Sequence, residues 1–150
     1  MSNYSFNLPL METAFRYCGF KTLQEFKDDC GYSARWYYNI VHNSDVLLTA
    51  LLDICTKYHL DPKAFFIEPN TVIAEVKTTR VFTFAWELKD YVILPDGSTK
   101  LFMKVLDPKI PFTTRQRFLR PGNSTMRARH LIYALNTYDL TPDQFFIPLY

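Results

Sequence analysis

An internal repeat constrains this chain of 150 residues more than any other feature of its sequence. The phrase KYHLDPKAFFIEP returns 80 positions later as TYDLTPDQFFIPLY. Without gaps, residues 31–68 match residues 111–148 at ten positions, among both apolar and turn residues. A match of this length is typical of a repeated structural unit. We therefore expect two related domains in tandem, residues 1–69 and residues 70–150.

Composition indicates a globular chain. Apolar residues make up 48% of the sequence and charged residues 21%, which is typical of a globular protein. Each half, with roughly 70 to 80 residues, is long enough for a small core. The longest apolar stretch, near VLLTALLDIC, is interrupted by Thr49 and Asp53 and is too short to cross a bilayer. The first residues do not resemble a secretory leader. The three cysteines are odd in number and lack paired spacing, so we expect reduced thiols and a cytoplasmic protein without membrane contact.

Motifs of enzymes and cofactor sites are missing from the sequence. There is no GxGxxG, P-loop or GxSxG segment. His42, His59 and His130 show no metal-ligand spacing. The pair Asp28 and Asp29 fits a solvated helix end better than a catalytic pair. We therefore expect neither catalysis nor a metal nor a cofactor.

Charge is distributed unevenly between the two halves. Residues 1–69 carry six Lys and Arg against eight Asp and Glu, whereas residues 70–150 carry eleven against seven. The first half is therefore −2 and the second +4. The segment FTTRQRFLRPGNSTMRARH places five arginines and His130 within nineteen residues that include no acid. An unbalanced basic cluster favours an anionic partner.

Local patterns predict four helices in the first repeat. The first lies near Leu10 and ends near Gly19, and the others span residues 23–30, 34–41 and 45–59. Thr22 with Glu25 forms a capping box, and Ser33 caps the third helix. On that helix Tyr37 and Ile40 share one face, whereas Arg35, Trp36 and Asn39 point outward. After Pro62, a short turn is expected to fold Phe65 and Phe66 back onto the core.

Residues 22–66, TLQEFKDDCGYSARWYYNIVHNSDVLLTALLDICTKYHLDPKAFF, follow the order of a helix-turn-helix unit. They resemble the lambda-repressor-like (Cro-type, XRE-like) DNA-binding family. The resemblance implies a recognition helix in residues 34–41 and a bacterial or phage origin. Two positions depart from the family pattern: Lys27 stands where a small Ala is usual, and Leu23 stands where a Gln commonly reaches DNA.

The second repeat keeps this plan more loosely. Its second helix is expected over residues 98–107, its third over 114–120 with Thr113 or Thr114 as cap, and its fourth over 124–139 with Ser124 as cap. At the repeat offset, Arg117 and Arg120 occupy the positions of the core residues Tyr37 and Ile40. Either this third helix is rotated, or Phe118 and Leu119 are the buried residues.

The segment between the repeats allows two interpretations. Residues 81–92 fit a helix equivalent to the first helix of the first repeat, whereas Asp96-Gly97 fits the turn of a β-hairpin. We favour the helix because it preserves the repeat. Residues 72–84 are also rich enough in β-branched and aromatic residues for a short strand pair. The expected fold is thus mainly α, with two tandem helix-turn-helix domains and a short hairpin between them as the alternative.

Side-chain chemistry selects candidate DNA-binding residues. Arg suits the N7 and O6 atoms of guanine and Gln suits adenine, while further arginines near a helix N-terminus suit phosphates. The family resemblance places Arg115, Gln116 and Leu119 at the DNA groove, and Arg120, Asn123, Arg127 and Arg129 are expected on phosphates. The full candidate set is Arg35, Trp36, Asn39, Thr114, Arg115, Gln116, Arg120, Asn123, Arg127 and Arg129.

Two functions remain open from the sequence. In the first, the chain is a sequence-specific transcriptional regulator that binds double-stranded DNA, with the second repeat making the stronger contact. In the second, the helix-turn-helix fold is retained as a protein-binding or structural module, and the partner is another protein or a second copy of the chain. The acidic balance of residues 1–69 and the aromatic run Trp36-Tyr37-Tyr38 favour protein contacts for the first repeat, with Trp36 partly buried.

Overall fold

The computed structural model describes residues 2–31, 33–69, 76–84, 91–120 and 124–149. The first half begins with a short strand and continues through four helices to a second short strand. Its elements are β1 (Ser5–Phe6), α1 (Leu8–Tyr17), α2 (Leu23–Cys30), α3 (Ala34–Asn43), α4 (Leu48–Tyr58), the 3-10 helix η1 (Pro62–Phe65) and β2 (Phe66–Ile67).

The second half has strands where the first has a helix. Its elements are β3 (Phe82–Phe84), β4 (Tyr91–Ile93), β5 (Thr99–Leu101), α5 (Phe102–Val105), α6 (Phe112–Phe118), α7 (Ala128–Tyr138), η3 (Pro142–Gln144) and β6 (Phe146–Pro148). Within the described residues, the strands form three antiparallel pairs, β1–β2, β3–β6 and β4–β5. The expectation of a mainly α fold is therefore wrong, because the chain has a mixed α/β fold.

The helices of the first half begin and end at residues that the sequence singles out. The Thr22 side chain accepts a hydrogen bond from the Glu25 N–H at 3.2 Å, and Ser33 accepts one from the Trp36 N–H at 3.1 Å. Gly31 ends α2 with a φ of 79°, a left-handed conformation that glycine adopts without steric cost. The predicted limits of α2 and both caps are confirmed.

A hairpin lies between the two repeats, where the repeat pattern predicts a helix. Tyr91 pairs with Leu101, and the turn is closed by the Leu94 N–H donating to the Ser98 carbonyl at 2.8 Å. Val92 is buried between the exposed Tyr91 and Ile93, which is the two-residue period of a strand. The predicted helix over 81–92 is wrong on its described residues, since β3 and β4 are strands; residues 85–90 lie outside the described part.

Helix starts in the second half also differ from those predicted. The span 98–107 opens with β5, and its helix α5 has only four residues. Helix α6 begins at Phe112 after Pro111, so neither Thr113 nor Thr114 is its N-cap. Helix α7 begins at Ala128 rather than at Ser124, and α4 begins at Leu48 rather than at Asp45.

The late starts of α4 and α7 have one cause, a short antiparallel bridge between the two halves. Leu47 pairs with Arg127. The Leu48 N–H donates to the Met126 carbonyl at 3.0 Å, and the Ala128 N–H donates to the Val46 carbonyl at 2.8 Å. The residues before each helix are therefore extended because they hydrogen-bond to the other half. We call this bridge the seam.

Phenylalanine rings repeat the same arrangement in each half. In the first half, Phe6 stacks on Phe65 at 6.0 Å and meets Phe66 edge-on; in the second, Phe84 stacks on Phe145 at 5.7 Å and meets Phe146 edge-on. The rings of Phe66 and Phe146 then stack on each other at 5.4 Å. Both are buried, at 3% and 1% exposure, so the repeated Phe-Phe-Ile phrase joins two halves around one core.

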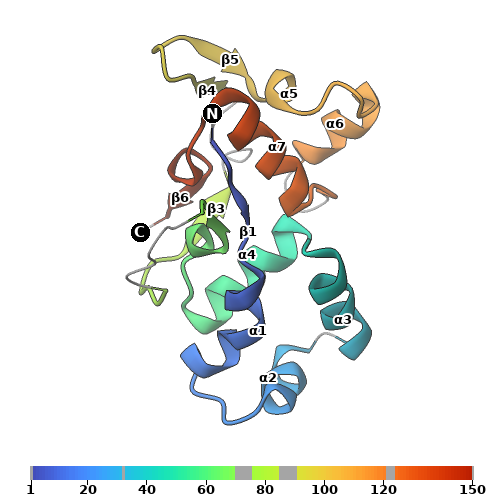
Figure 1. Cartoon of the computed structure of the whole chain (residues 1–150), viewed down its shortest axis with the longest axis vertical. Coiled ribbons are helices and arrows are strands. Elements are labelled where there is room, and N and C mark those ends of the chain that lie inside the picture. The colour runs from blue at the N-terminus through green and yellow to red at the C-terminus, as the bar shows by residue number, and fades with distance from the viewer. Residues whose placement is uncertain (1, 32, 70–75, 85–90, 121–123, 150) are drawn as a thin grey trace.

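The halves also exchange contacts through their first strands. Strand β1 packs against α7 of the second half, and β3 packs against α4 of the first. Tyr4 directly precedes β1, and Asn136 lies on α7. The Tyr4 N–H donates to the Asn136 side-chain oxygen at 2.6 Å, and the Asn136 amide donates back to the Tyr4 carbonyl. Figure 1 shows β1 running along the long helices at the centre of the molecule. The division at residues 69 and 70 stays a prediction from the repeat.

Candidate nucleic-acid interface

Helix α3 presents a polar outer face. Tyr37 and Ile40 are buried, and Arg35 and Asn39 are exposed. Trp36 is half-buried and packs at the margin of the core. This pattern is the one predicted from helical spacing, and it leaves the predicted contact residues of α3 at or near the surface.

The two departures from the family pattern have structural explanations. The Lys27 ammonium lies 4.8 Å above the Tyr37 ring, so a cation–π contact takes the place of a small residue where α2 meets α3. Leu23 is half-buried against the core. Helix α2 is further held to α4 by the Tyr58 hydroxyl, which donates to the Asp29 carboxylate at 2.6 Å. These contacts make α2 a support for α3.

Helix α6 is rotated relative to α3. Phe118 is buried and stacks on His130 with ring centroids 4.6 Å apart, whereas Tyr38, its counterpart at the repeat offset, is 56% exposed. Arg117 is exposed although its counterpart Tyr37 is buried. The rotation turns Thr113, Gln116 and Arg117 outward and confirms that Phe118 is a core residue of this helix. Leu119 is half-buried against the core, and Arg120, just after α6, is exposed.

Arg115 is engaged inside the second half. It is half-buried, its Nη1 donates to the Met103 carbonyl at 3.3 Å, and its guanidinium lies 5.8 Å from the centre of the Phe112 ring. Its Nε is buried and has no hydrogen-bond partner among the residues that the structure describes. Thr114 beside it is also half-buried. The structure thus directs Arg115 towards α5, while its neighbours Gln116 and Arg117 point to solvent.

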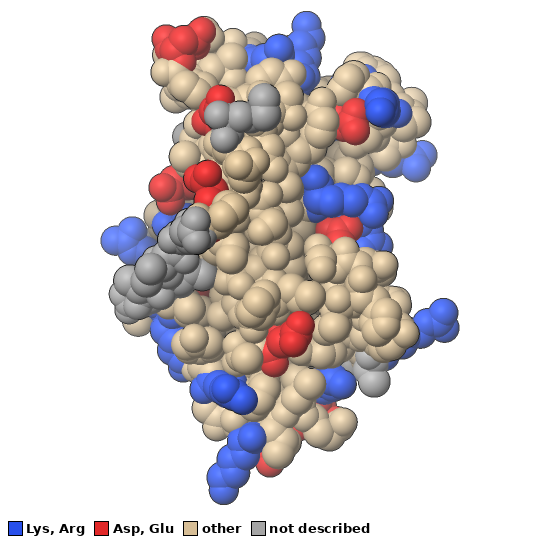
Figure 2. All heavy atoms as spheres, in the orientation of Figure 1, with Lys and Arg blue, Asp and Glu red and all other residues tan. Residues whose placement is uncertain are grey.

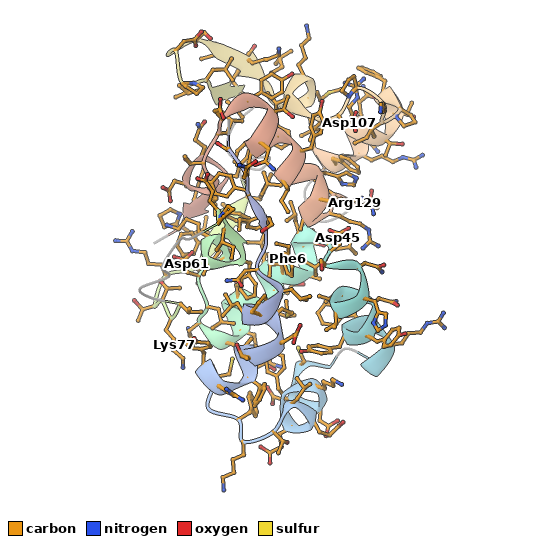
Figure 3. All side chains as sticks on the ribbon, in the orientation of Figure 1. Phe6, Asp45, Asp61, Lys77, Asp107 and Arg129 are labelled. Carbon is orange, nitrogen blue, oxygen red and sulfur yellow. The ribbon has the colours of Figure 1, made fainter. Side chains whose placement is uncertain are left out.

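A buried carboxylate joins the N-terminus of α7 to the first half. Asp45 is only 5% exposed, and its Oδ1 accepts the N–H groups of Val46 at 2.9 Å and of Arg129 at 3.1 Å. Its Oδ2 lies 3.4 Å from the Arg129 guanidinium. Figure 3 shows Asp45 and Arg129 side by side between α4 and α7. The start of α7 is therefore capped by a residue from the other half.

His130 connects α6 to the first turn of α7. Its Nδ1 accepts the Arg127 N–H at 2.9 Å, so the ring is neutral and carries its proton on Nε2. Burial lowers the pKa of His130, and the charges of Arg129 and Arg127 lower it further, while Asp45 and Asp107 act in the opposite direction. A neutral imidazole is thus part of the folded geometry of this region.

The predicted contact residues of the two halves meet at a groove beside the seam. The groove has a volume of about 640 Å³. Four predicted residues line it, namely Trp36, Asn39, Arg127 and Arg129. Arg35, Thr114, Arg115, Gln116 and Arg120 lie on α3 and around α6 outside its lining, and Asn123 falls outside the described residues.

A basic edge runs along one side of the molecule. Helix α3, the N-terminus of α7 and helix α6 follow one another along the right-hand side of Figure 1, and Figure 2 shows Lys and Arg side chains near the N-terminus of α7 and around α6, with acidic side chains among them. We define the basic edge by Arg35, Asn39, Gln116, Arg117, Arg120, Arg127 and Arg129. Arg117 is the member that sequence reasoning missed. The apolar character of Phe118 could have revealed it, since burying Phe118 turns Arg117 outward.

The three cysteine thiols are not activated. Burial raises the pKa of the Cys18 thiol to about 11 and raises the pKa values of Cys30 and Cys55 as well, so all three are protonated at neutral pH. Among the described residues, no cluster of His, Cys, Asp and Glu is arranged to hold a metal ion. In the same part of the chain, no helix combines the length and apolarity needed to span a membrane.

Comparison of the chain with protein-family models, with curated proteins and with solved structures gave no significant match. The resemblance of residues 22–66 to the lambda-repressor-like family therefore stays an expectation from the sequence. The candidate interface rests on the geometry and charge of the basic edge itself.

Proposed function

We propose that this chain is a transcriptional regulator that binds double-stranded DNA along the basic edge. One observation carries the proposal: the seam brings α3 and α6, one from each half, to the same side of the molecule, with Arg127 and Arg129 between them. In this arrangement α3 and α6 can each enter a major groove of the duplex. Arg127 and Arg129 then face the phosphates between these two grooves.

Base reading is assigned to the outward residues of the two helices. On α3 these are Arg35 and Asn39, and on α6 they are Gln116 and Arg117, all exposed. Arg pairs with two acceptors of guanine, and Asn and Gln pair with the acceptor and donor of adenine. These four side chains therefore have the chemistry needed to discriminate bases in a major groove.

Phosphate binding is assigned to the centre of the edge and to the end of α6. The Arg129 side chain is 67% exposed even with Asp45 3.4 Å away, so its outer guanidinium face remains available. Arg127 lies in the same groove, and Arg120 is exposed just after α6. Each such contact releases counterions from DNA, which makes affinity strongly dependent on salt.

Fluorescence anisotropy of a labelled random-sequence duplex, titrated with the full chain at increasing NaCl, tests the proposal. We expect log affinity to fall linearly with log salt. The double variant Arg120→Ala/Arg127→Ala removes two of the arginines assigned to phosphates and should flatten that slope by about two units, one for each lost phosphate contact. The matched control is Lys77→Ala/Arg80→Ala, which removes two exposed cations on the left-hand side of Figure 3, where Lys77 is labelled. Salt-independent affinity, or equal losses in both double variants, would contradict DNA binding by this edge.

A second candidate function, protein binding, is favoured by the outer face of the β4–β5 hairpin. Tyr91, Ile93 and Leu101 are 56%, 55% and 40% exposed on that face, and exposed aromatic and aliphatic side chains are typical of protein contacts. A concentration series by analytical ultracentrifugation checks whether a second copy covers this face. Self-association that Ile93→Ser abolishes would support the candidate, and a concentration-independent monomer would count against it.

A further inference from the structure

We infer that a single chain spans two inverted and unequal half-sites on DNA, without a second copy. The inference rests on the proposed DNA binding and adds the orientation, number and difference of the sites. It starts from the seam. At the repeat offset, Leu48 corresponds to Ala128 and Val46 to Met126. The bond from the Leu48 N–H to the Met126 carbonyl therefore has its exact counterpart in the bond from the Ala128 N–H to the Val46 carbonyl.

Reciprocal contacts of this kind are produced by a two-fold axis. In an isologous interface, residue i contacts residue j and the equivalent of j contacts the equivalent of i. Equivalent residues on the axis meet each other, as Leu47 does with Arg127 in the bridge and Phe66 with Phe146 in the ring stack. The two halves of this chain are thus arranged like the subunits of a symmetric dimer.

The arrangement is held by contacts that leave little freedom between the halves. The core residues of both halves form one continuous cluster. Strand β1 packs on α7, and β3 packs on α4. Asp45 of the first half binds the first turn of α7 in the second. The spacing between α3 and α6 is consequently set by the fold rather than by a flexible linker.

A two-fold relation determines how the two helices meet a duplex. DNA has a local two-fold axis relating its strands, and a two-fold pair of recognition helices binds half-sites in inverted orientation at fixed spacing. Because α3 and α6 are related by the seam, the sites they read should be inverted with respect to each other. One chain supplies both helices, so one chain occupies the whole site.

The half-sites should differ because the two reading faces differ. Helix α3 offers Arg35 and Asn39, whereas the rotated α6 offers Gln116 and Arg117. Each helix therefore offers one Arg, which suits guanine, and one amide side chain, which suits adenine. The two side chains occupy different helix positions in the two halves, so the bases that they prefer occur in a different order. The preferred site is therefore an imperfect inverted repeat.

Selection of bound sequences from a random duplex pool with the full chain supplies the site, and variants of that site test the inference by fluorescence anisotropy. Inserting about five base pairs, roughly half a helical turn, between the halves should weaken binding at least about tenfold. Converting the site into a direct repeat should have a similar effect. Each perfect palindrome built from one half alone should bind about tenfold more weakly than the selected site. Sedimentation of the complex should give one chain per duplex.

Matched protein variants show which half of the chain reads which half of the DNA site. Arg35→Ala should relax base preference at one end of the site and Arg117→Ala at the other; both side chains are exposed, so both variants are expected to fold. Two chains per duplex, a selected site with a single half, or tolerance of the half-turn insertion would overturn the inference while leaving DNA binding in place. Failure to bind any duplex would remove both the inference and the proposed function.

Discussion

Helices α3 and α6 occupy equivalent places in the two halves, yet they are built differently. Helix α3 has ten residues, a Ser33 cap and buried Tyr37 and Ile40. Helix α6 has seven residues, follows Pro111 and buries Phe118. The long helices α4 and α7, in contrast, bury equivalent residues. Leu51 of α4 and Leu131 of α7 correspond at the repeat offset, and both are fully buried. A repeat is thus kept where side chains pack around the shared core and changes where side chains meet solvent.

The rotation of α6 has a packing cause. Of the two phenylalanines of α6, Phe112 is exposed, whereas Phe118 is buried and stacks on His130 of α7. Once Phe118 is buried, the helix geometry directs Arg117 outward. A rotation of one residue therefore exchanges one set of surface side chains for another without moving the helix out of its place. The comparison between α3 and α6 can be tested by variants that should affect the halves equally and by variants that should not.

The largest effect is expected at the ring pair that joins the halves. Phe66→Ala and Phe146→Ala should each lower the free energy of unfolding by about 3 to 5 kcal/mol, because each removes a buried ring and leaves a cavity. Urea denaturation measures both. Equal losses would agree with equivalent positions, and the double variant should cost less than the sum because the rings stack on each other. A variant that unfolds like the parent protein would mean that its ring does not support the core.

A smaller and unequal effect is expected at the cap of α7. Asp45→Ala should cost about 1 to 2 kcal/mol, because the N–H groups of Val46 and Arg129 lose their acceptor. Thr125, its counterpart at the repeat offset, is exposed, so Thr125→Ala should change stability by no more than about 0.5 kcal/mol. Thermal unfolding distinguishes the two. Equal losses would indicate that the halves cap each other symmetrically.

Adjacent arginines of α6 are expected to separate stability from DNA affinity. Arg115→Ala should lower the free energy of unfolding by about 1 kcal/mol through loss of the bond to the Met103 carbonyl. Arg117→Ala should leave stability unchanged and reduce affinity for the selected duplex, because Arg117 is exposed. Unfolding and anisotropy measurements on both variants are needed. The reverse result would place Arg115 at the groove, as the sequence alone suggested.

The smallest effect is expected from His130 and depends on pH. Its folded pKa lies below that of the unfolded chain, so the stability it contributes is complete above the unfolded pKa of about 6.5 and is lost as pH falls through the folded pKa. Burial disfavours the protonated imidazole, and the charge of Arg129 adds to this effect. A protonated Nδ1 also cannot accept the Arg127 N–H. Unfolding measured between about pH 7 and pH 5 should show this loss. In His130→Gln the same change of pH should have a smaller effect, and an unchanged pH profile would exclude His130 as its source.

Much of the first half could be predicted because its signals are local. Thr22, Ser33 and Gly31 act on residues within one turn of themselves, and helical spacing alone assigns Tyr37 and Ile40 to the core. The buried Phe66 and Phe146 follow from the repeated phrase. Such features need no knowledge of the rest of the fold.

The seam and the short strands could not be predicted in this way. Val46 and Leu47 continue the apolar spacing of α4, yet they are extended because they pair with Ala128 and Arg127 in the other half of the chain. Strand β1 has two residues, too few to show a period. In the candidate site, the proximity of Asn39 to Arg127 also depends on the seam. Their placement is a property of tertiary pairing, which a pattern within one segment does not contain.

Because the seam joins two halves of one chain, a substitution changes one half without changing the other. When two copies of a gene product form a symmetric dimer, every substitution appears twice and assembly depends on protein concentration. With both copies fused in one chain, assembly is intramolecular and each position varies alone. Asp45 illustrates the outcome: it caps α7 across the axis, while the equivalent residue in the second half is an exposed threonine. One half has thereby become a support for the other, an asymmetry that no homodimer could encode.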